Sequence, residues 1–589
     1  MAESTIPQTR RASELESDPG DESCAKRPKV DGDASGVEYA TGGTEGVVER
    51  IDEDLAPLVK ESTVNDMQSN SLGSEKNQPP KRATKKKRKQ KEPPLPESCS
   101  APDVLHQEIC HLLGREAVES ITASGGAFKS PYPDGHELEI TIEKVGSGGS
   151  GIARAPGSES WAIVVPFALP EEKVRVEIVG RPERMYSNAK MLEILQPNEA
   201  WRDDSRVRCQ YFTQCGGCQY QMLSSEKQLD LKKNVITRAY ETYSKLPAAS
   251  LPSTEETTES PLVYKYRTKI TPHFERPRKS IKPYDIKDGE HPPWLKIGFN
   301  LVGRNETMDI EECPIATDVL NEQYKKDRKD IAQKIFSYKK GVSLMYRDSL
   351  DGSLDAVEMM SLSTTDRELS EAFTKHVCVT DQKGLSREMV GDYLFEYTAG
   401  SFFQNNNTIL PLLVDYVKDT IAGPSTSSGT KHPTHLVDTY CGAGLFAISL
   451  SDRFEHVAGI ELSSASIASA KRNAELNQIP PTKISFLAGD AANIFDVVRS
   501  FPPSQTVVVI DPPRKGCDEA FIKQLVEFRA ATVVYVSCNV HTQARDVGDI
   551  VRRTEGDDEG RRYRVERVRG FDLFPQTAHV ESVAVLRLF

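Results

Sequence analysis

A cysteine and two carboxyl groups stand at the ends of apolar runs, where side chains of these types could carry out chemistry. Cys538 follows the run "VVYVS", and Asp511 follows the run "VVVI". Such runs predict buried strands, and open α/β sheets keep their active sites at the carboxyl ends of their strands. Glu581 stands just before the last apolar run of the chain, "SVAVLRLF". We therefore expect the cysteine and Asp511 at the carboxyl edge of one sheet.

A cysteine and a carboxylate can together catalyse the methylation of the C5 carbon of uracil by a methyl donor. This carbon is a poor nucleophile until a thiolate adds to C6, and a base must later remove the C5 proton so that the thiolate can leave. Cys538 would supply the thiolate, and a helix expected in "HTQARDVGDIVRR" would lower its pKa from ~8.5. Glu581 and His579 are both candidates for the base. Both residues also have a purely structural interpretation: Cys538 could be a small buried hydrophobic side chain, and Glu581 could form a salt bridge at the surface.

A glycine turn upstream suits a nucleotide-like ligand. Gly442 and Gly444 follow the strand expected in "HLVDTY" and precede a helix, so the backbone can approach a ligand there. Glu461 ends the next expected strand, where an acid binds ribose hydroxyls. Together with Ala447 the glycines formally match a dinucleotide fingerprint, so a dehydrogenase is an alternative, as is a turn without a ligand. Asp511, followed by two prolines, favours S-adenosylmethionine, because an acid suits a sulfonium centre better than it suits hydride transfer or a pyrophosphate.

A cysteine cluster predicts a metal centre apart from this site. Cys209, Cys215 and Cys218 have a C-x5-C-x2-C spacing in "CQYFTQCGGCQ", and Cys313 in "EECPIA" could be a fourth ligand. Four thiolates without histidine suit a [4Fe–4S] cluster or structural zinc, and free thiols are the third possibility. Such a centre would stabilise the middle of the chain, because no step of the methylation needs an electron.

The elements that must position these residues predict an α/β protein with several domains. From residue 402 to 589, strand and helix patterns alternate, which predicts a doubly wound, Rossmann-like sheet ending in strands near 563–572 and 582–589. Residues 200–400 mix helices and strands and predict an α+β middle domain. Short alternating strands over 130–196 predict a small β-barrel, which suits RNA binding but could be purely structural.

The N-terminal residues 1–100 predict a disordered tail, because they are acidic, rich in Ser, Gly and Pro and poor in large apolar residues. Within the tail, Lys81 to Lys91 reads "KRATKKKRKQK", with eight basic residues and no acid. This run is typical of a nuclear import signal, an RNA-contacting arm or a solvated tail. We expect the protein in the nucleus, the cytoplasm or both, since the acidic start does not resemble a mitochondrial presequence.

The composition limits the classes of function. The 589 residues are 38% hydrophobic, enough for several cores, and the length suggests about four domains. The net charge of −12 argues against a protein held to nucleic acid by overall charge, although local basic faces are compatible with it. Eleven cysteines are too sparse for a disulfide scaffold and favour a reducing compartment. No apolar run approaches the ~20 residues that span a bilayer, so we expect no membrane contact.

Five motifs in this order resemble the S-adenosylmethionine-dependent RNA uracil-5-methyltransferase family: "SFFQNN", "DTYCGAG", "DPPRKG", "SCN" and "DLFPQTAHVES". The barrel before them resembles a TRAM domain, and the resemblance covers roughly 130 to 589. It implies Cys538 as the nucleophile and Glu581 as the base that takes the C5 proton. The methyl-donor positions that it implies are Gln404, Tyr440, Glu461 and Asp511, with Asp490 near the adenine.

The resemblance also bears on the substrate. The cysteine spacing is similar to that of the bacterial ribosomal-RNA branch, whose members carry a [4Fe–4S] cluster. The long tail with its basic run is typical of a eukaryotic protein. Similar eukaryotic members methylate the T-loop uridine of transfer RNA, at position 54, so we expect this substrate rather than ribosomal RNA. A loop uridine fits because the target base must leave its stack. Val540 replaces the family's usual proline, which loosens the loop but removes no reacting group. We expect a monomer; a non-catalytic RNA-binding or RNA-folding protein is the alternative.

Overall fold

The computed structural model describes residues 95–123, 128, 130–362, 370–422, 432–489, 495, 498–555 and 560–589. All the described residues belong to one compact unit, Arg88–Phe589. The predicted disordered tail, except for its last residues, and the basic run Lys81–Lys91 therefore lie outside the described residues. None of the helices in the described ranges has the length and hydropathy needed to cross a lipid bilayer.

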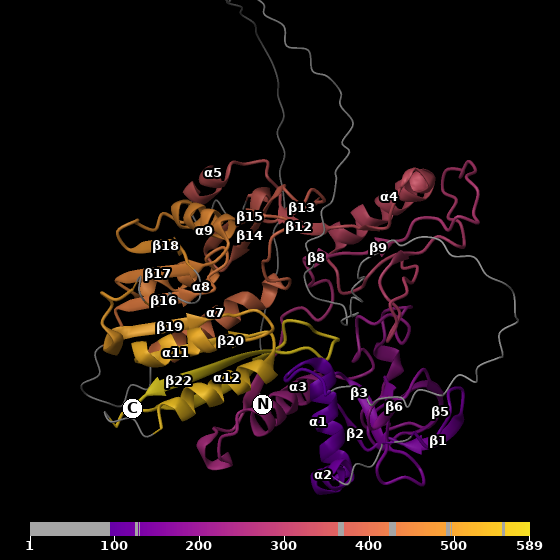
Figure 1. The fold of residues 1–589 in the computed structure, drawn as a ribbon. Helices are drawn as coiled ribbons and strands as arrows, with labels where there is room; N and C mark the ends of the chain where they lie inside the picture. The colour runs from indigo at the N-terminus through magenta and orange to yellow at the C-terminus, as the bar shows by residue number, and fades with distance from the viewer. Residues whose placement is uncertain are drawn as a thin grey trace, which may run out of the picture. The chain divides into compact units, whose positions relative to one another are not determined.

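An eight-stranded sheet forms the C-terminal part of the protein (Figure 1). Its strand order is β18-β17-β16-β19-β20-β22-β21-β7. Five neighbouring strands are parallel, β22 is antiparallel to β20 and to β21, and β7 pairs parallel to β21. The strands are β7 (Glu255–Thr258), β16 (His435–Thr439), β17 (His456–Glu461), β18 (Ile484–Ala488), β19 (Thr506–Ile510), β20 (Thr532–Ser537), β21 (Tyr563–Phe571) and β22 (Glu581–Leu588). The predicted doubly wound sheet and its two final strands are confirmed.

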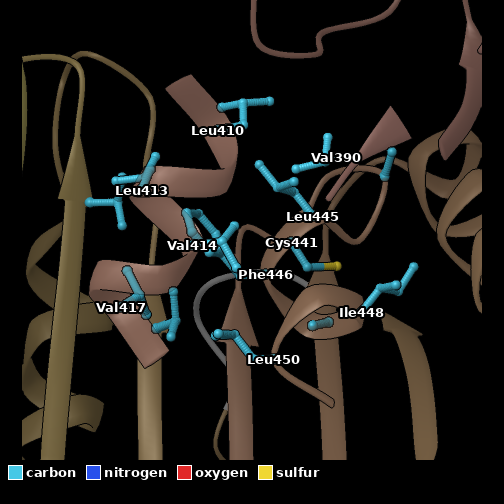
Figure 2. Packing of buried hydrophobic residues seen from close by; sticks show 14 of the residues in the cluster. Val390, Leu410, Leu413, Val414, Val417, Cys441, Leu445, Phe446, Ile448 and Leu450 are labelled. Carbon is cyan, nitrogen blue, oxygen red and sulfur yellow. The ribbon is translucent and has the colours of Figure 1, made fainter. Parts of the chain in front are cut away.

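Both faces of this sheet are covered, because successive residues of its buried strands point into two different cores. In β19, Val507 and Val509 belong to one core, and Val508 and Ile510 to the other. Figure 2 shows side chains of α7 and α8 packed together in the first core. The second core is completed by α3, α11 and α12. The helices are α3 (Ser225–Tyr243), α7 (Leu410–Ala422), α8 (Leu445–Ser449), α9 (Ser464–Leu476), α11 (Glu519–Phe528) and α12 (Val540–Arg553).

The sheet extends beyond the segment that starts at residue 402, where we placed the domain boundary. Strand β7 lies before that boundary, and Glu255 in it forms ion pairs with Arg567 and Arg569 of β21. The hairpin of β14 (Leu385–Val390) and β15 (Tyr393–Thr398) also contributes side chains to the first core. The predicted boundary at 402 is therefore wrong for this sheet, because a four-residue strand gives no sign of a partner some three hundred residues later.

The predicted small barrel is confirmed as a six-stranded sheet in the order β1-β5-β6-β4-β3-β2. Its core surrounds the buried Trp161, and alternate residues of β5 are buried, as the sequence pattern predicts. Two helices that the sequence analysis did not predict, α1 (Ala101–Leu113) and α2 (Arg115–Ala123), precede it. The strands are β1 (Glu137–Thr141), β2 (Lys144–Val145), β3 (Ser150–Arg154), β4 (Ala162–Pro166), β5 (Lys173–Val179) and β6 (Tyr186–Gln196).

The middle of the chain contains two three-stranded sheets, β10-β9-β11 and β13-β12-β8, packed with helix α4. This agrees with the α+β composition predicted there. The elements are β8 (Lys269–Ile270), β9 (His273–Phe274), β10 (Ile297–Gly298), α4 (Asp318–Lys334), β11 (Val342–Ser343), β12 (Tyr346–Leu350), α5 (Ala356–Ser361) and β13 (His376–Val379).

Candidate active site

Cys538 lies at the carboxyl edge of the sheet, between the end of β20 and the start of α12. Asn539 caps the helix, because its side chain accepts a hydrogen bond from the His541 amide at 3.1 Å. The backbone carbonyl of Arg514 accepts hydrogen bonds from the side-chain amide of Asn539 (2.9 Å) and the Thr542 hydroxyl (3.2 Å). These bonds tie the "DPPRKG" loop to the loop that carries the cysteine.

The pKa of the Cys538 thiol is raised to about 12. Burial is the main cause, and the neighbouring carboxyl groups of Glu581 and Asp511 raise the pKa further. Arg514 opposes them, because its positive charge favours the thiolate. Burial and the two carboxyl groups therefore outweigh any lowering of this pKa by the helix start, and the thiol is protonated at neutral pH.

Glu581 faces the cysteine across two neighbouring strands. Ser537 of β20 pairs with Ser582 of β22, so the next residue along each strand is Cys538 on one side and Glu581 on the other. Burial raises the pKa of Glu581 well above its usual value, and Asp511 adds to this effect while Arg514 opposes it. Burial also raises the pKa of Asp511 to about 7.

His579 is a weaker base than Glu581. Burial, together with the charges of Arg514 and Lys232, lowers the pKa of His579 to about 3, so its ring is neutral at physiological pH. Its Nε2 atom is buried and makes no hydrogen bond within the described residues. Of the two candidates, Glu581 therefore has the more suitable pKa for accepting a proton.

The glycine turn after β16 has the backbone geometry that its residues predict. Tyr440 (φ +60°), Gly442 (φ +53°) and Gly444 (φ +93°) all occupy the left-handed region, which favours glycine. Glu461 at the end of β17 accepts hydrogen bonds from the amides of Gly442 (3.2 Å) and Ser463 (2.9 Å). The acid and the glycine turn thus form one unit at the carboxyl edge of the sheet.

Asp438 of β16 supports this turn, and the sequence analysis gave it no role. Its Oδ2 accepts a hydrogen bond from the Ala447 amide at 2.8 Å, and its Oδ1 has no partner among the described residues. Burial raises the pKa of Asp438 well above its usual value, and Asp511 and Glu461 add to the shift. The available signal was a single acid inside an otherwise apolar strand.

Gln404 is buried in the loop that follows β15. Arg347, which is fully buried, donates a hydrogen bond to the carbonyl of Ser401 on one side of this loop. On the other side, the Asn406 side chain donates to the carbonyl of Leu573 at 3.1 Å. The loop is therefore fixed to the segment that leads to Glu581. Asp490 lies outside the described residues.

The four cysteines Cys209, Cys215, Cys218 and Cys313 are neighbours in space. Burial raises the pKa of Cys218, and the charges of the other three thiols raise it further. The amide of Gly217 donates to the sulfur of Cys215 at 3.4 Å. Within the described ranges, however, no three His, Cys, Asp or Glu side chains stand close enough together to hold a metal ion. The four cysteines therefore lie in one region without the geometry of a metal-ligand set.

Comparison with known proteins finds matches along most of the chain. The family model described as tRNA (Uracil-5-)-methyltransferase matches residues 337–588, and the TRAM domain model matches residues 134–180. A Schizosaccharomyces pombe protein named tRNA (uracil(54)-C(5))-methyltransferase is 40% identical over 506 residues, which cover 86% of each chain. The Saccharomyces cerevisiae protein of the same name is 33% identical over 591 residues, covering 94% of this chain and 89% of its own.

A solved structure has the same fold. It is the Pyrococcus abyssi tRNA (uracil-54, C5)-methyltransferase in complex with S-adenosyl-L-homocysteine, with a TM-score of 0.52, 22% identity and coverage of 76% of this chain and 100% of that chain. Fold, site and relatives together define an S-adenosylmethionine-dependent RNA methyltransferase. Within that class, the chain belongs to the tRNA (uracil-5-)-methyltransferase family, with a TRAM domain ahead of its catalytic part.

Proposed function

We propose that this protein methylates C5 of uridine 54 in the T-loop of transfer RNA and thereby forms 5-methyluridine. The strand register that sets Cys538 opposite Glu581 carries the proposal, because this chemistry needs a thiol and a base on one target ring. The names of both fungal relatives include uracil 54, and the TRAM match supports an RNA substrate.

In the first step Cys538 forms a bond from its sulfur to C6 of the uracil, and the electrons of the C5–C6 double bond move toward O4 as an enolate. The thiol must first lose its proton to water, although burial raises its pKa to about 12. The positive charge of Arg514 favours the thiolate, and the methyl donor, when bound, would add the charge of its sulfonium.

Residues of the glycine turn and of neighbouring loops bind the methyl donor in this proposal. Glu461 is positioned to accept hydrogen bonds from ribose hydroxyls, and Asp511 to stabilise a sulfonium. Gln404 and Tyr440 complete the site, with Asp490 assigned to the adenine side. S-adenosylmethionine supplies an electrophilic methyl group. The enolate carbon C5 attacks that group, forms the C5–CH3 bond and releases S-adenosylhomocysteine.

Glu581 completes the reaction as the base. Its carboxylate takes the proton from C5, those electrons re-form the C5–C6 double bond, and the bond from C6 to the sulfur of Cys538 breaks. A buried carboxylate with a raised pKa is a stronger base than an exposed one, which favours this proton transfer.

We also propose that the four cysteines Cys209, Cys215, Cys218 and Cys313 bind an iron–sulfur cluster, with zinc as the alternative. Their mutual proximity and the amide donated to the sulfur of Cys215 support this, since metal-bound thiolates commonly accept such bonds. The side chains would have to move closer together, because no ligand set is formed in the structure. Iron, sulfide and zinc analysis of protein purified without oxygen distinguishes the three states.

Methyl transfer from labelled S-adenosylmethionine to transfer RNA transcripts tests the function. A transcript with uridine at position 54 should accept one methyl group, and a matched transcript with cytidine there should accept none. Methylation of ribosomal RNA but not of transfer RNA would favour the other substrate. Binding of both RNAs without methylation would favour an RNA-folding protein.

A further inference from the structure

The loop from Asp572 to Val580 joins β21 to β22 and ends directly at Glu581. Its two ends are fixed, because Phe571 and Glu581 are paired across the hairpin. Between these ends, the loop is held by residues that lie outside the hairpin and far away in sequence. We propose that Lys232 and Gln228 of α3 are positioning residues that hold this loop for removal of the C5 proton. This inference rests on the covalent mechanism proposed above.

Lys232 anchors the start of the loop. The side chain of Lys232 is fully buried and forms an ion pair with Asp572, which is also buried. The same ammonium group donates a hydrogen bond to the carbonyl of Phe574 at 3.0 Å. An apolar pair of similar volume would often be as stable as a buried ion pair, so stability alone does not account for this one. The charged pair does specify one arrangement of the loop, because each of the two buried charges needs the other as its partner.

Gln228 anchors the middle of the loop at Gln576. Gln576 has a φ of +71°, a conformation that is unfavourable for a residue with a side chain and persists only when its surroundings enforce it. Its amide donates to the Gln228 side chain at 2.9 Å, and that side chain donates back to the Gln576 side chain at 3.2 Å. The carbonyl of Gln576 accepts bonds from the amides of Gln219 (2.9 Å) and Tyr220 (3.0 Å). The contacts therefore determine the backbone at this point.

Three further hydrogen bonds continue the support along the loop. They join Asn406 to the Leu573 carbonyl (3.1 Å), the Tyr266 hydroxyl to the Pro575 carbonyl (3.0 Å) and the Ala578 amide to the Gln219 side chain (3.1 Å). Gln219 directly follows Cys218, so part of this support comes from the cysteine-bearing segment.

The nucleophile is held differently from the loop. Cys538 lies where β20, the last of the five parallel strands, meets α12, and none of the hydrogen bonds described above for the loop involves those two elements. Loss of the α3 contacts should therefore disturb the loop, with His579 and the segment that leads into Glu581, more than it disturbs the cysteine. Thiolate addition and methyl transfer would continue, while proton removal would slow. The methylated intermediate, still bonded to Cys538, would accumulate.

The test compares wild-type protein with Lys232→Met, Gln228→Leu and the double variant Lys232→Met/Asp572→Leu. The double variant removes both charges and so leaves no unpaired carboxylate in the core. With ordinary transfer RNA, we expect turnover to fall about tenfold to a hundredfold, as for a misplaced catalytic group. A complex that survives denaturing electrophoresis should appear with the same RNA. With 5-fluorouracil-substituted RNA, in which no C5 proton can leave, all variants should form the complex at a rate within about threefold of wild type.

Arg202→Met is the matched control. Arg202 forms a buried ion pair with Glu172 at 2.6 Å, and its other bonds go to Asp204 and the Phe167 carbonyl, none of which belongs to the loop. It should reduce thermal stability without any build-up of the complex on ordinary RNA.

Two results would overturn the inference. One is a double variant with wild-type turnover and no accumulated complex, which would make the pair purely structural. The other is loss of complex formation on the fluorinated RNA in parallel with loss of turnover. If wild-type protein itself formed no complex with fluorinated RNA, the covalent mechanism would fail, and not only the role of α3.

Discussion

Replacing Arg514 with methionine should slow the attack of Cys538 on the uracil by raising the pKa of the thiol. Arg514 opposes the effects of burial, Glu581 and Asp511 on this pKa. A neighbouring cation shifts the pKa of an ionisable group by about one to three units. Because Arg514 is one of several groups that act on the thiol, its loss should raise the pKa by about one to two units. The thiolate fraction at neutral pH should therefore fall about 10- to 100-fold.

The rate of complex formation with 5-fluorouracil-substituted transfer RNA measures this step, at saturating RNA and in a single turnover. The thiol pKa of about 12 lies above the assay pH, so the logarithm of the rate should rise with pH between about pH 6 and about pH 9. Arg514→Met should give a parallel line, displaced downward. Lys515→Met is the control, because Lys515 is the adjacent cation but is not among the main causes of the shift in the pKa of Cys538.

An Arg514→Met protein that reacts at the wild-type rate once RNA is saturating would refute this reasoning. Arg514 would then contact RNA without affecting the thiol. An equal loss of rate in Lys515→Met would also refute it, since positive charge near the loop would then suffice.

Two further predictions concern the donor site and the buried carboxyl groups. Glu461→Ala should weaken S-adenosylmethionine binding by about tenfold or more, because the ribose loses a charged hydrogen-bond acceptor, whereas the affinity for RNA should not change. Calorimetry with each ligand measures both affinities, and an unchanged affinity for the methyl donor would contradict this prediction. Burial raises the pKa of Glu388 to about 7, so the folded protein keeps a proton that the unfolded chain has already released. Stability should therefore fall as the pH rises from about 4.5 to about 7, by roughly 3 kcal/mol. Glu388→Gln should remove this loss of stability, which thermal melts at several pH values can measure. An unchanged pH dependence of stability in the variant would contradict the prediction.

The sequence predicted the residues at strand ends well, because the patterns behind them are local. A buried strand is a short apolar run, and in a parallel sheet the residue after such a run lies at a known edge. This placed Cys538, Asp511 and Glu461 at the edge where the structure has them. The alternation in β5 and the glycine turn were predictable for the same reason.

Features that depend on distant contacts were not predictable. Strand β7 and helix α3 join the sheet through pairing and packing with residues near the end of the chain, which no local pattern records. The net pKa of the thiol was not predictable from the helix start alone, because burial and the two carboxyl groups outweigh it. The role of Lys232 depends on Asp572, a partner 340 residues away.

The most direct test of the account compares wild-type protein with Cys538→Ala on 5-fluorouracil-substituted transfer RNA and methyl-labelled S-adenosylmethionine. Wild-type protein should form a complex that contains protein, RNA and methyl label and that survives denaturation. Cys538→Ala should form none and should not methylate ordinary transfer RNA, although it still binds both ligands. Methylation by Cys538→Ala at the wild-type rate would contradict the central claim that a sulfur–carbon bond must form before the methyl group is transferred.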